Sequence, residues 1–290
     1  MRALPRYPLV LTLLAGALLA GCPPKTEQPA APPGPAKAPT PPKGPGEVVV
    51  LAAASLTEAF SAVEPAAEAA LDADVKISFG GSQALRTSIE QGNAADVFAS
   101  ANMEHIDALK QANLISDAFE FAHNKLAFIA PKGNPAGIES LADLRDKPVR
   151  LVIGVEESPV GKYTRKLLAA CDADPQFGAG FSKAVLAKVA SEDADVKQVL
   201  SKVTLGAADA AFVYDSDITP EVRGQVEQFE IPPSVQQVVT YGIGIPATAR
   251  NPKGGRKFVE ALLSEAGQEA IHQSAVLEFI PSAKPPWTAN

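Results

Sequence analysis

Patterns typical of buried strands and of helices alternate along residues 48–214, and this alternation restricts the fold more than any other feature of the chain. The run Val48–Ala54 is continuously apolar, as in a strand covered on both faces, and a helical pattern, Ser55–Leu71, follows it directly. Further strands are predicted at Val75–Phe79, Val97–Ala99, Lys125–Ala130, Arg150–Val155 and Ala210–Tyr214, and further helices at Gln83–Gln91, Met103–Ala112, Ser140–Arg145, Pro159–Ala170 and Val196–Leu205. The sequence therefore predicts an α/β fold with a mainly parallel sheet and helices on both of its faces.

Two extended segments are suited to pass between two lobes. These are Phe121–Ile129 and Val238–Pro246. If both cross, residues 128–237 form one lobe, and residues 47–127 together with 238–290 form the other. Ligands of α/β folds lie outside the carboxyl ends of the strands, so we expect a binding site in the cleft between the lobes.

A short apolar run near the N-terminus is typical of a signal peptide. The run Leu9–Ala20 follows Arg2 and Arg6, and it is too short to span a bilayer. It ends in Leu19-Ala20-Gly21-Cys22, which resembles the lipobox of bacterial lipoproteins, where the cysteine carries the lipid. We therefore predict a lipoprotein signal peptide over residues 1–21 and a lipid on Cys22. An ordinary cleaved signal is the alternative.

Residues 22–46 have the composition of a tether. They are rich in proline and alanine and lack the apolar residues that would offset the entropy cost of ordering. Proline keeps such a segment extended, so it would act as a semi-rigid spacer. We predict a protein on the periplasmic side of a bacterial cell envelope, attached to the membrane through Cys22.

Charge and cysteine content limit the partners of the folded part. The formal charge of −7 becomes −9 when the signal peptide removes Arg2 and Arg6, which argues against nucleic acid and anionic lipid surfaces as partners. A small anion is still possible if local dipoles bind it. With Cys22 lipidated, Cys171 is left without a disulfide partner, and we expect it to be buried as a small apolar residue. We expect a monomer.

Serines stand where two of the predicted strands turn into helices. Ser55 follows the apolar run at 48–54, and Glu58 lies three residues later, as in a capping box. Gly81 and Ser82 stand at a similar junction after the strand predicted at 75–79. Hydroxyl groups and free amides at such turns suit an oxyanion.

Two further helix starts in the second half of the chain offer main-chain donors. Ser158 suits an N-cap and Pro159 suits the first helical position, which places the Val160 amide at the positive end of a helix. The segment Ser191–Lys197 is predicted as another helix start, with the Val196 amide in its first turn. Tyr214 ends an apolar strand and adds a phenol donor. Each feature taken alone is also typical of an ordinary capped helix.

The ordered set of motifs resembles the periplasmic molybdate-binding proteins of ABC importers, the ModA family. The resemblance rests on Val-Leu-Ala-Ala-Ala-Ser-Leu-Thr-Glu-Ala-Phe at 50–60, and on Phe79-Gly-Gly-Ser82-Gln-Ala-Leu85-Arg-Thr-Ser-Ile89-Glu-Gln-Gly92-Asn-Ala-Ala95-Asp96-Val97-Phe98-Ala-Ser100-Ala101. Pro159-Val160-Gly161-Lys-Tyr163 and Phe212-Val213-Tyr214-Asp-Ser216-Asp217 follow in the same order. The match covers essentially all of residues 47–290.

The resemblance implies a two-lobed periplasmic-binding-protein fold of type II that captures molybdate, and tungstate with it, for the membrane subunits of an ABC permease. It implies that Ser55, Ser82, Tyr214 and the amides of Val160 and Val196 hold the oxyanion through its oxygens, with no direct metal ligand and no cofactor. The chain departs from the family at Gly80-Gly81, at Val160 and at Asp195, where a neutral residue is common. Such a set of donors suits a fully ionised dianion, because the dianion has only acceptors.

Other functions are less favoured by the sequence. A different tetrahedral oxyanion such as sulfate is the nearest alternative, since the fold alone does not decide among ligands. Gly80-Gly81-Ser82 approximates the nucleophile elbow of a serine hydrolase, but neither His105, His123 nor His272 stands in a glycine-rich turn. We therefore expect a binding protein and not an enzyme.

Overall fold

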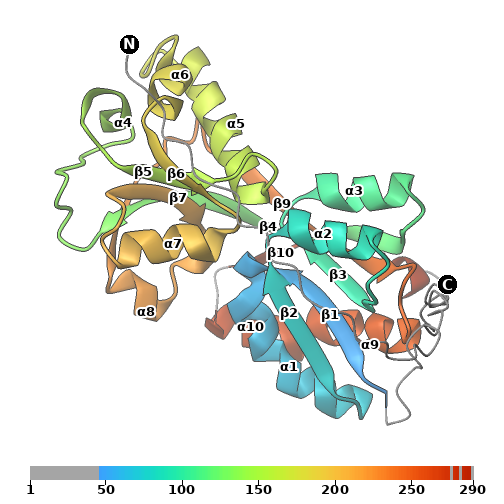
Figure 1. The fold of residues 1–290 in the computed structure, drawn as a ribbon. Helices are drawn as coiled ribbons and strands as arrows, with labels where there is room; N and C mark the ends of the chain where they lie inside the picture. Colours follow the sequence, from blue (N-terminus) through green and yellow to red (C-terminus); the bar gives the residue numbers. More distant parts are fainter. Residues whose placement is uncertain (1–45, 275–276, 281–282, 289–290) are drawn as a thin grey trace, which may run out of the picture. The chain divides into compact units, whose positions relative to one another are not determined.

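Two β-sheets that share one long strand organise the chain (Figure 1). The computed structural model describes residues 46–274, 277–280 and 283–288. The predicted signal peptide and the lipid on Cys22 lie outside the described residues, and so does the predicted tether except for Gly46. Among the described residues, no helix has the length and apolar character needed to cross a membrane.

The first sheet has three parallel strands at one side and antiparallel strands at the other. β1 (Val48–Ala53) lies between β2 (Val75–Gly80) and β3 (Val97–Ser100) and is parallel to both. β9 (Val238–Pro246) pairs antiparallel with β3 and with β4 (Ile115–Pro131), and the short β10 (Glu278–Phe279) adds to β4. We call this sheet and its helices the first lobe.

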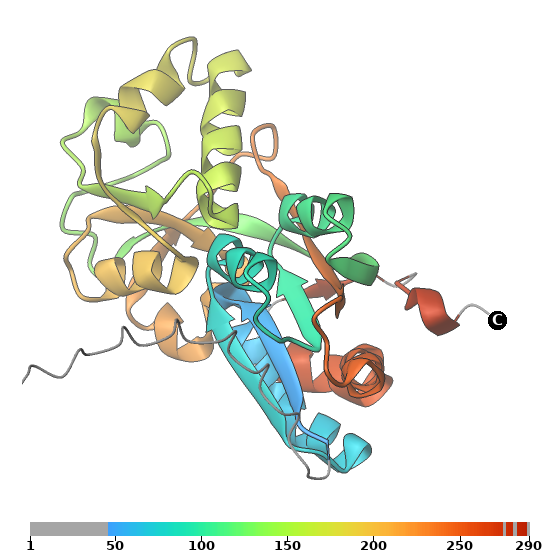
Figure 2. The same cartoon turned by 45° about the vertical axis from the view of Figure 1, so that its right-hand side comes forward.

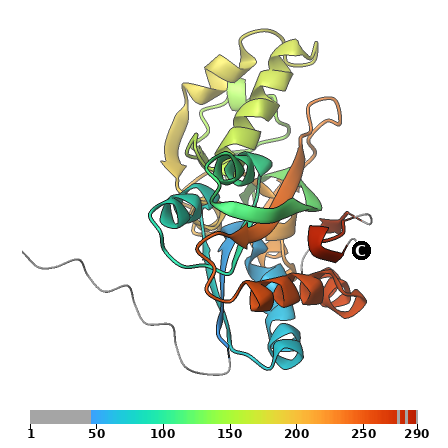
Figure 3. The same ribbon diagram turned by 90° about the vertical axis from the view of Figure 1, so that its right-hand side faces the viewer.

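Helices cover both faces of this sheet. On one face lie α1 (Thr57–Leu71), α9 (Pro252–Leu263) and α10 (Glu265–Ser274), and on the other α2 (Ser82–Glu90) and α3 (Met103–Gln111) (Figure 1 and Figure 3). Successive side chains of a strand point to opposite faces, so β1 serves two cores. Val50 and Ala52 join the core of α1 and α9, whereas Leu51 packs with Ile89 and Ile106.

The second lobe is built around the remaining strands (Figure 2). β5 (Leu151–Gly154) is parallel to β6 (Val189–Asp193) and β7 (Ala210–Tyr214), and the end of β4 pairs antiparallel with β7 and β8 (Val226–Phe229). Its helices are α4 (Asp143–Asp146), α5 (Pro159–Ala173), α6 (Phe181–Leu186), α7 (Val196–Thr204) and α8 (Pro220–Arg223).

β4 connects the two lobes directly. Its residues 115–125 pair with β9 in the first sheet, and residues 126–131 pair with β7 and β8 in the second. β4 is therefore 17 residues long, where the sequence predicted a strand of about six. The two-lobed α/β fold is confirmed, although the sheets are mixed, because the crossing strands run antiparallel to their neighbours. The lobe boundaries at 127/128 and 237/238 stay a prediction.

Candidate functional site

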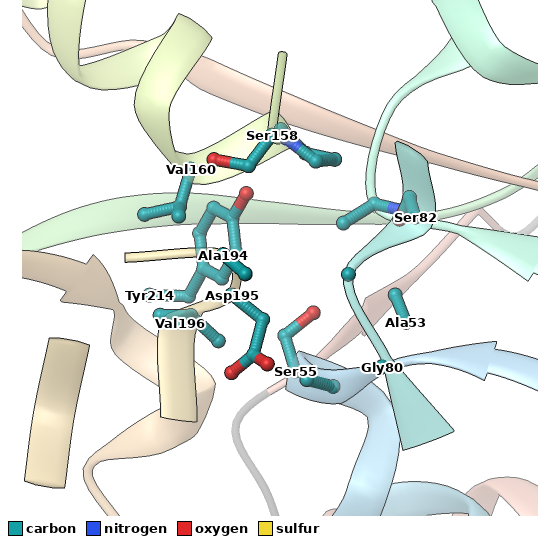
Figure 4. Close-up of a pocket in the computed structure, with 14 residues that line it drawn as sticks. Ala53, Ser55, Gly80, Ser82, Ser158, Val160, Ala194, Asp195, Val196 and Tyr214 are labelled. Carbon is teal, nitrogen blue, oxygen red and sulfur yellow. The ribbon is translucent and has the colours of Figure 1, made fainter. Parts of the chain in front are cut away.

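A small cavity of about 20 Å³ lies between the two lobes (Figure 4). All five residues predicted to hold an anion line it: Ser55, Ser82, Val160, Val196 and Tyr214. The other lining residues are Ala53, Ala54, Gly80, Gly81, Ala101, Ser158, Pro159, Ala194 and Asp195. These residues follow the carboxyl ends of β1, β2, β3, β5, β6 and β7, or end the strand themselves, which is where α/β folds place their ligands. That the five residues bind a ligand stays a prediction.

Ser55 is positioned by a tight turn, and not by a helix cap as predicted. It lies in a 3-10 turn, Ala54–Leu56, after which α1 begins at Thr57 without a side-chain cap. The predicted capping box is wrong, because Glu58 instead contacts the Lys197 ammonium, with both carboxylate oxygens 2.8 Å from Nζ. The Ser55 hydroxyl oxygen accepts a hydrogen bond from the Tyr241 hydroxyl over 3.0 Å.

Ser82 is the first residue of α2, one residue earlier than the predicted helix start. Its side chain is buried, and its Oγ accepts from the Ala101 amide over 3.2 Å. Gly81 precedes it where space is limited, since a Cβ there would lie 2.7 Å from the Ala194 carbonyl oxygen of the second lobe. Both serines thus already accept a bond from the protein, and the single hydroxyl hydrogen of each is available to donate into the cavity.

Two helix N-termini of the second lobe face the cavity. Ser158 caps α5, because its Oγ accepts from the Gly161 amide over 3.1 Å and donates to the Val155 carbonyl. Val160 lies in the first turn of this helix, where amides have no acceptor within the helix. Such amides and the positive end of the helix dipole favour an anion.

α7 begins at Val196 behind an aspartate cap. One carboxylate oxygen of Asp195 accepts from the amides of Lys197 and Gln198, and the other accepts from the Gln198 side chain. The amide of Val196 lies ahead of both capped amides, in the first turn. The helix predicted at Val196–Leu205 is confirmed, although the first residues of the segment leading into it belong to β6, which was not predicted.

Tyr214 brings a buried phenol to the cavity from the end of β7. Its side chain is 1% exposed, and within the described part of the chain its hydroxyl oxygen has no hydrogen-bond partner. Burial raises the pKa of Tyr214, so the phenol keeps its proton and remains a donor. Figure 4 shows Tyr214 and Ser55 reaching from different lobes into the space between them.

Charged groups join the lobes beside the cavity but do not line it. The Lys197 ammonium lies between Glu58 of the first lobe and the buried Asp217 of the second, 3.1 Å from the latter. Burial raises the pKa of Asp217, an effect that Lys197 opposes. The Gln83 side-chain amide also crosses between the lobes and donates to the Ala194 carbonyl over 2.7 Å. No lysine or arginine is among the described residues of the cavity wall.

Sequence reasoning missed the residues that stand behind the serines. Tyr241 and the Ala101 amide contact the two hydroxyls from outside the predicted set. Tyr241 lies in the predicted crossing segment Val238–Pro246. The signal that could have indicated its role is a single tyrosine among the apolar residues and glycines of that segment. No cluster of three or more histidine, cysteine, aspartate or glutamate side chains suited to a metal ion occurs in the described ranges, and Cys171 is buried as expected.

Comparison with known proteins identifies the family. The family model of the bacterial extracellular solute-binding proteins matches residues 48–274 of the sequence. The molybdate-binding protein ModA of Mycobacterium tuberculosis is 33% identical over 243 residues, which are 83% of this chain and 88% of that protein. The chain belongs to the ModA family of extracellular solute-binding proteins. Membership in a family of binding proteins bears out the expectation that it is not an enzyme, and the hydrolase alternative is not favoured.

Two more distant relatives extend the comparison. A putative ABC transporter substrate-binding lipoprotein of Bacillus subtilis, YvgL, is 26% identical over 202 residues, which are 69% of this chain and 74% of that protein. The structure of the substrate-binding domain of a putative molybdenum ABC transporter from Clostridium difficile has a TM-score of 0.58 and 27% identity, and the match covers 81% of this chain and 99% of that one. The match to this solved structure agrees with the two-lobed fold.

Proposed function

We propose that this protein captures molybdate, and tungstate with it, outside the cytoplasmic membrane and delivers it to the membrane subunits of an ABC permease. The observation that carries the proposal is the donor character of the cavity: apart from the Asp195 carboxylate, which caps α7, the polar groups placed to meet a ligand are donors. Two serine hydroxyls already accept from the protein, a buried phenol lacks a partner, and two amides lie in first helical turns.

This donor set favours an anion that carries no proton. Molybdate, tungstate and sulfate are fully ionised dianions and only accept hydrogen bonds, whereas hydrogen phosphate also needs an acceptor. Among the described residues of the cavity wall the one carboxylate belongs to Asp195, and its oxygens are engaged in capping α7. The small size of the cavity suits a compact anion better than an organic solute. Charge-assisted hydrogen bonds contribute about 1.5–3 kcal/mol each, so a handful outweighs the ordering cost of binding.

The remaining parts of the proposal concern the anchor and the mode of delivery. A lipid on Cys22 would hold a monomer at the membrane, and the oxyanion is cargo, so no cofactor is invoked. The lobes would close by a hinge motion in β4 and β9, because the dianion meets donors of both lobes only in the closed form. The lipoprotein relative from Bacillus subtilis and the lipobox-like sequence support the anchor.

Calorimetric titration of the ligand-free protein with molybdate, tungstate, sulfate and phosphate tests the function. We expect one-to-one binding of molybdate and tungstate, and weak or undetectable binding of phosphate. Donors held at fixed spacing separate molybdate from the smaller sulfate, so sulfate should bind much more weakly. If sulfate binds as tightly as molybdate or more tightly, the proposed site is retained but the proposed substrate is wrong. If none of the four anions binds, the proposal is overturned.

A further inference from the structure

A chain of hydrogen bonds runs from the second lobe through the crossing strands to Ser55. The Asn124 side-chain nitrogen donates to the Ser216 hydroxyl over 2.8 Å and to the Tyr241 hydroxyl over 3.2 Å. The Tyr241 hydroxyl donates in turn to the Ser55 hydroxyl over 3.0 Å. Asn124 lies on β4 and Tyr241 on β9, so both crossing strands take part.

The orientation of the Asn124 side chain fixes the direction of these hydrogen bonds. The Lys125 amide donates to the Asn124 side-chain oxygen over 2.8 Å, which assigns the oxygen and leaves the nitrogen facing the hydroxyls. An amide nitrogen only donates, so the Tyr241 oxygen must accept from it. The hydrogen of Tyr241 is then directed to Ser55, whose oxygen accepts, and the hydrogen of Ser55 is left for the cavity.

Burial keeps this chain isolated from water. Tyr241 is 0% exposed, and Ser55, Ser216 and Asn124 are buried as well. Desolvation by burial raises the pKa of Tyr241, so its phenol proton stays in place as the donor to Ser55. In such surroundings linked hydrogen bonds strengthen one another.

We propose that Tyr241, held by Asn124, is a positioning residue that commits the Ser55 hydroxyl to donate to the bound oxyanion. Without the Tyr241 hydroxyl, Ser55 is free to rotate and to place a lone pair toward the anion. Ser55 would then lose part of its contribution to binding although its side chain is intact. This inference rests on the proposed function, because it concerns the same site.

A double-mutant cycle with molybdate as the probe tests the proposal in the full chain. Tyr241→Phe removes one oxygen, and we expect affinity to fall about threefold to tenfold, as for the loss of one hydrogen bond. The same change in a Ser55→Ala background should alter affinity less than about twofold, whereas in a Ser82→Ala background it should keep its full effect. A merely structural role of Tyr241 would give equal effects in both backgrounds.

A matched control and a second variant keep the test decisive. Tyr163→Phe also removes a phenol oxygen that contacts β9, at the Thr240 amide, but it lies outside the cavity wall and should leave affinity unchanged. Asn124→Asp keeps the shape but accepts from Tyr241, which draws the phenol hydrogen away from Ser55, so affinity should fall at least as far as in Tyr241→Phe.

The outcomes separate the two proposals. If the wild-type protein binds molybdate and either Tyr241→Phe or Asn124→Asp binds it with the same affinity, the positioning role alone is overturned. Equal effects of Tyr241→Phe in the Ser55→Ala and Ser82→Ala backgrounds would also overturn it. Absence of binding by the wild-type protein to all four oxyanions would overturn the proposed function and this inference with it.

Discussion

At the scale of single residues, the Tyr214 hydroxyl has opposite effects on the stability of the ligand-free protein and on its affinity for an anion. It is buried at the cavity without a hydrogen-bond partner among the described residues. An unpaired polar group in the interior costs about 1–3 kcal/mol of stability. An anion oxygen that accepts from the phenol removes this penalty, so the group that weakens the ligand-free fold strengthens the complex.

Tyr214→Phe should therefore separate stability from affinity. We expect the unfolding free energy of the ligand-free protein to stay the same or to rise by about 1 kcal/mol, and molybdate affinity to fall about fivefold to a hundredfold. Urea unfolding and calorimetric titration measure the two quantities. Tyr163→Phe is the control, because its hydroxyl accepts from the Thr240 amide, and it should lose stability but keep affinity. If Tyr214→Phe instead loses stability and keeps its molybdate affinity, Tyr214 is not part of the binding site.

At the scale of elements, the N-terminus of α7 combines a good cap with an unfavourable charge. Asp195 satisfies two amides of the first turn, which stabilises the helix, but its carboxylate lines the cavity proposed for a dianion. Asparagine caps helices about as well as aspartate, and it carries no charge. The aspartate thus favours folding of α7 more than it favours anion binding.

We expect Asp195→Asn to raise molybdate affinity about threefold to thirtyfold, since a unit charge several ångströms from a dianion costs about 1–2 kcal/mol at an effective dielectric between that of protein and water. Stability should fall by less than about 1 kcal/mol, because the cap is kept and part of the interaction with the helix dipole is lost. Asp172→Asn, near the far end of α5, controls for net charge and should leave affinity unchanged. Weaker binding by Asp195→Asn would contradict the repulsion.

α3 carries a buried histidine that should make the fold sensitive to acid. Burial, and after it the charges of Arg86 and Lys162, together lower the pKa of His105 from 6.5 to about 4. The unfolded chain therefore binds the proton at higher pH than the folded chain does. Stability from this group is complete above pH 6.5 and is lost as the pH falls toward 4.

We expect the unfolding free energy to drop by about 2 kcal/mol between pH 7.5 and pH 5 because of His105 alone. Urea unfolding at the two pH values measures this drop. It should be largely absent in His105→Gln, where the group does not titrate, and fully present in His123→Gln. An equal drop in all three proteins would show that other groups cause it.

The elements also show what the sequence was able to predict. The strand-to-helix junctions at Ser55 and Ser82 were found because apolar runs are local signals, and the junction at Val160 because Ser158 and Pro159 mark a capped helix start. The start of α1 was predicted wrongly because Glu58 does not cap the helix but accepts a hydrogen bond from Lys197, which is 139 residues away in the chain. β6 was missed because its side chains are half-buried or exposed and lack an apolar run. The contact of Tyr241 with Ser55 depends on the packing of distant segments, which no local pattern contains.

At the scale of the whole molecule, β4 makes the two lobes depend on each other. Its first part pairs with β9 in one sheet and its last residues pair with β7 and β8 in the other, so neither sheet is complete without it. The proposed donors are divided in the same way, with Ser55 and Ser82 in the first lobe and Tyr214 and the two amides in the second. An anion bound between them should stabilise the entire folded chain.

Ligand should therefore shift one cooperative unfolding transition. Each tenfold rise in free molybdate above the dissociation constant should raise the unfolding free energy by about 1.4 kcal/mol, because the anion binds the folded chain only. Ser82→Ala should show the same slope, beginning at a higher molybdate concentration. Small-angle scattering should show a smaller radius of gyration with molybdate than without it, as the hinge closes. Two separate transitions, of which molybdate shifts one, would mean that a single lobe holds the anion and that the shared strand does not couple the lobes.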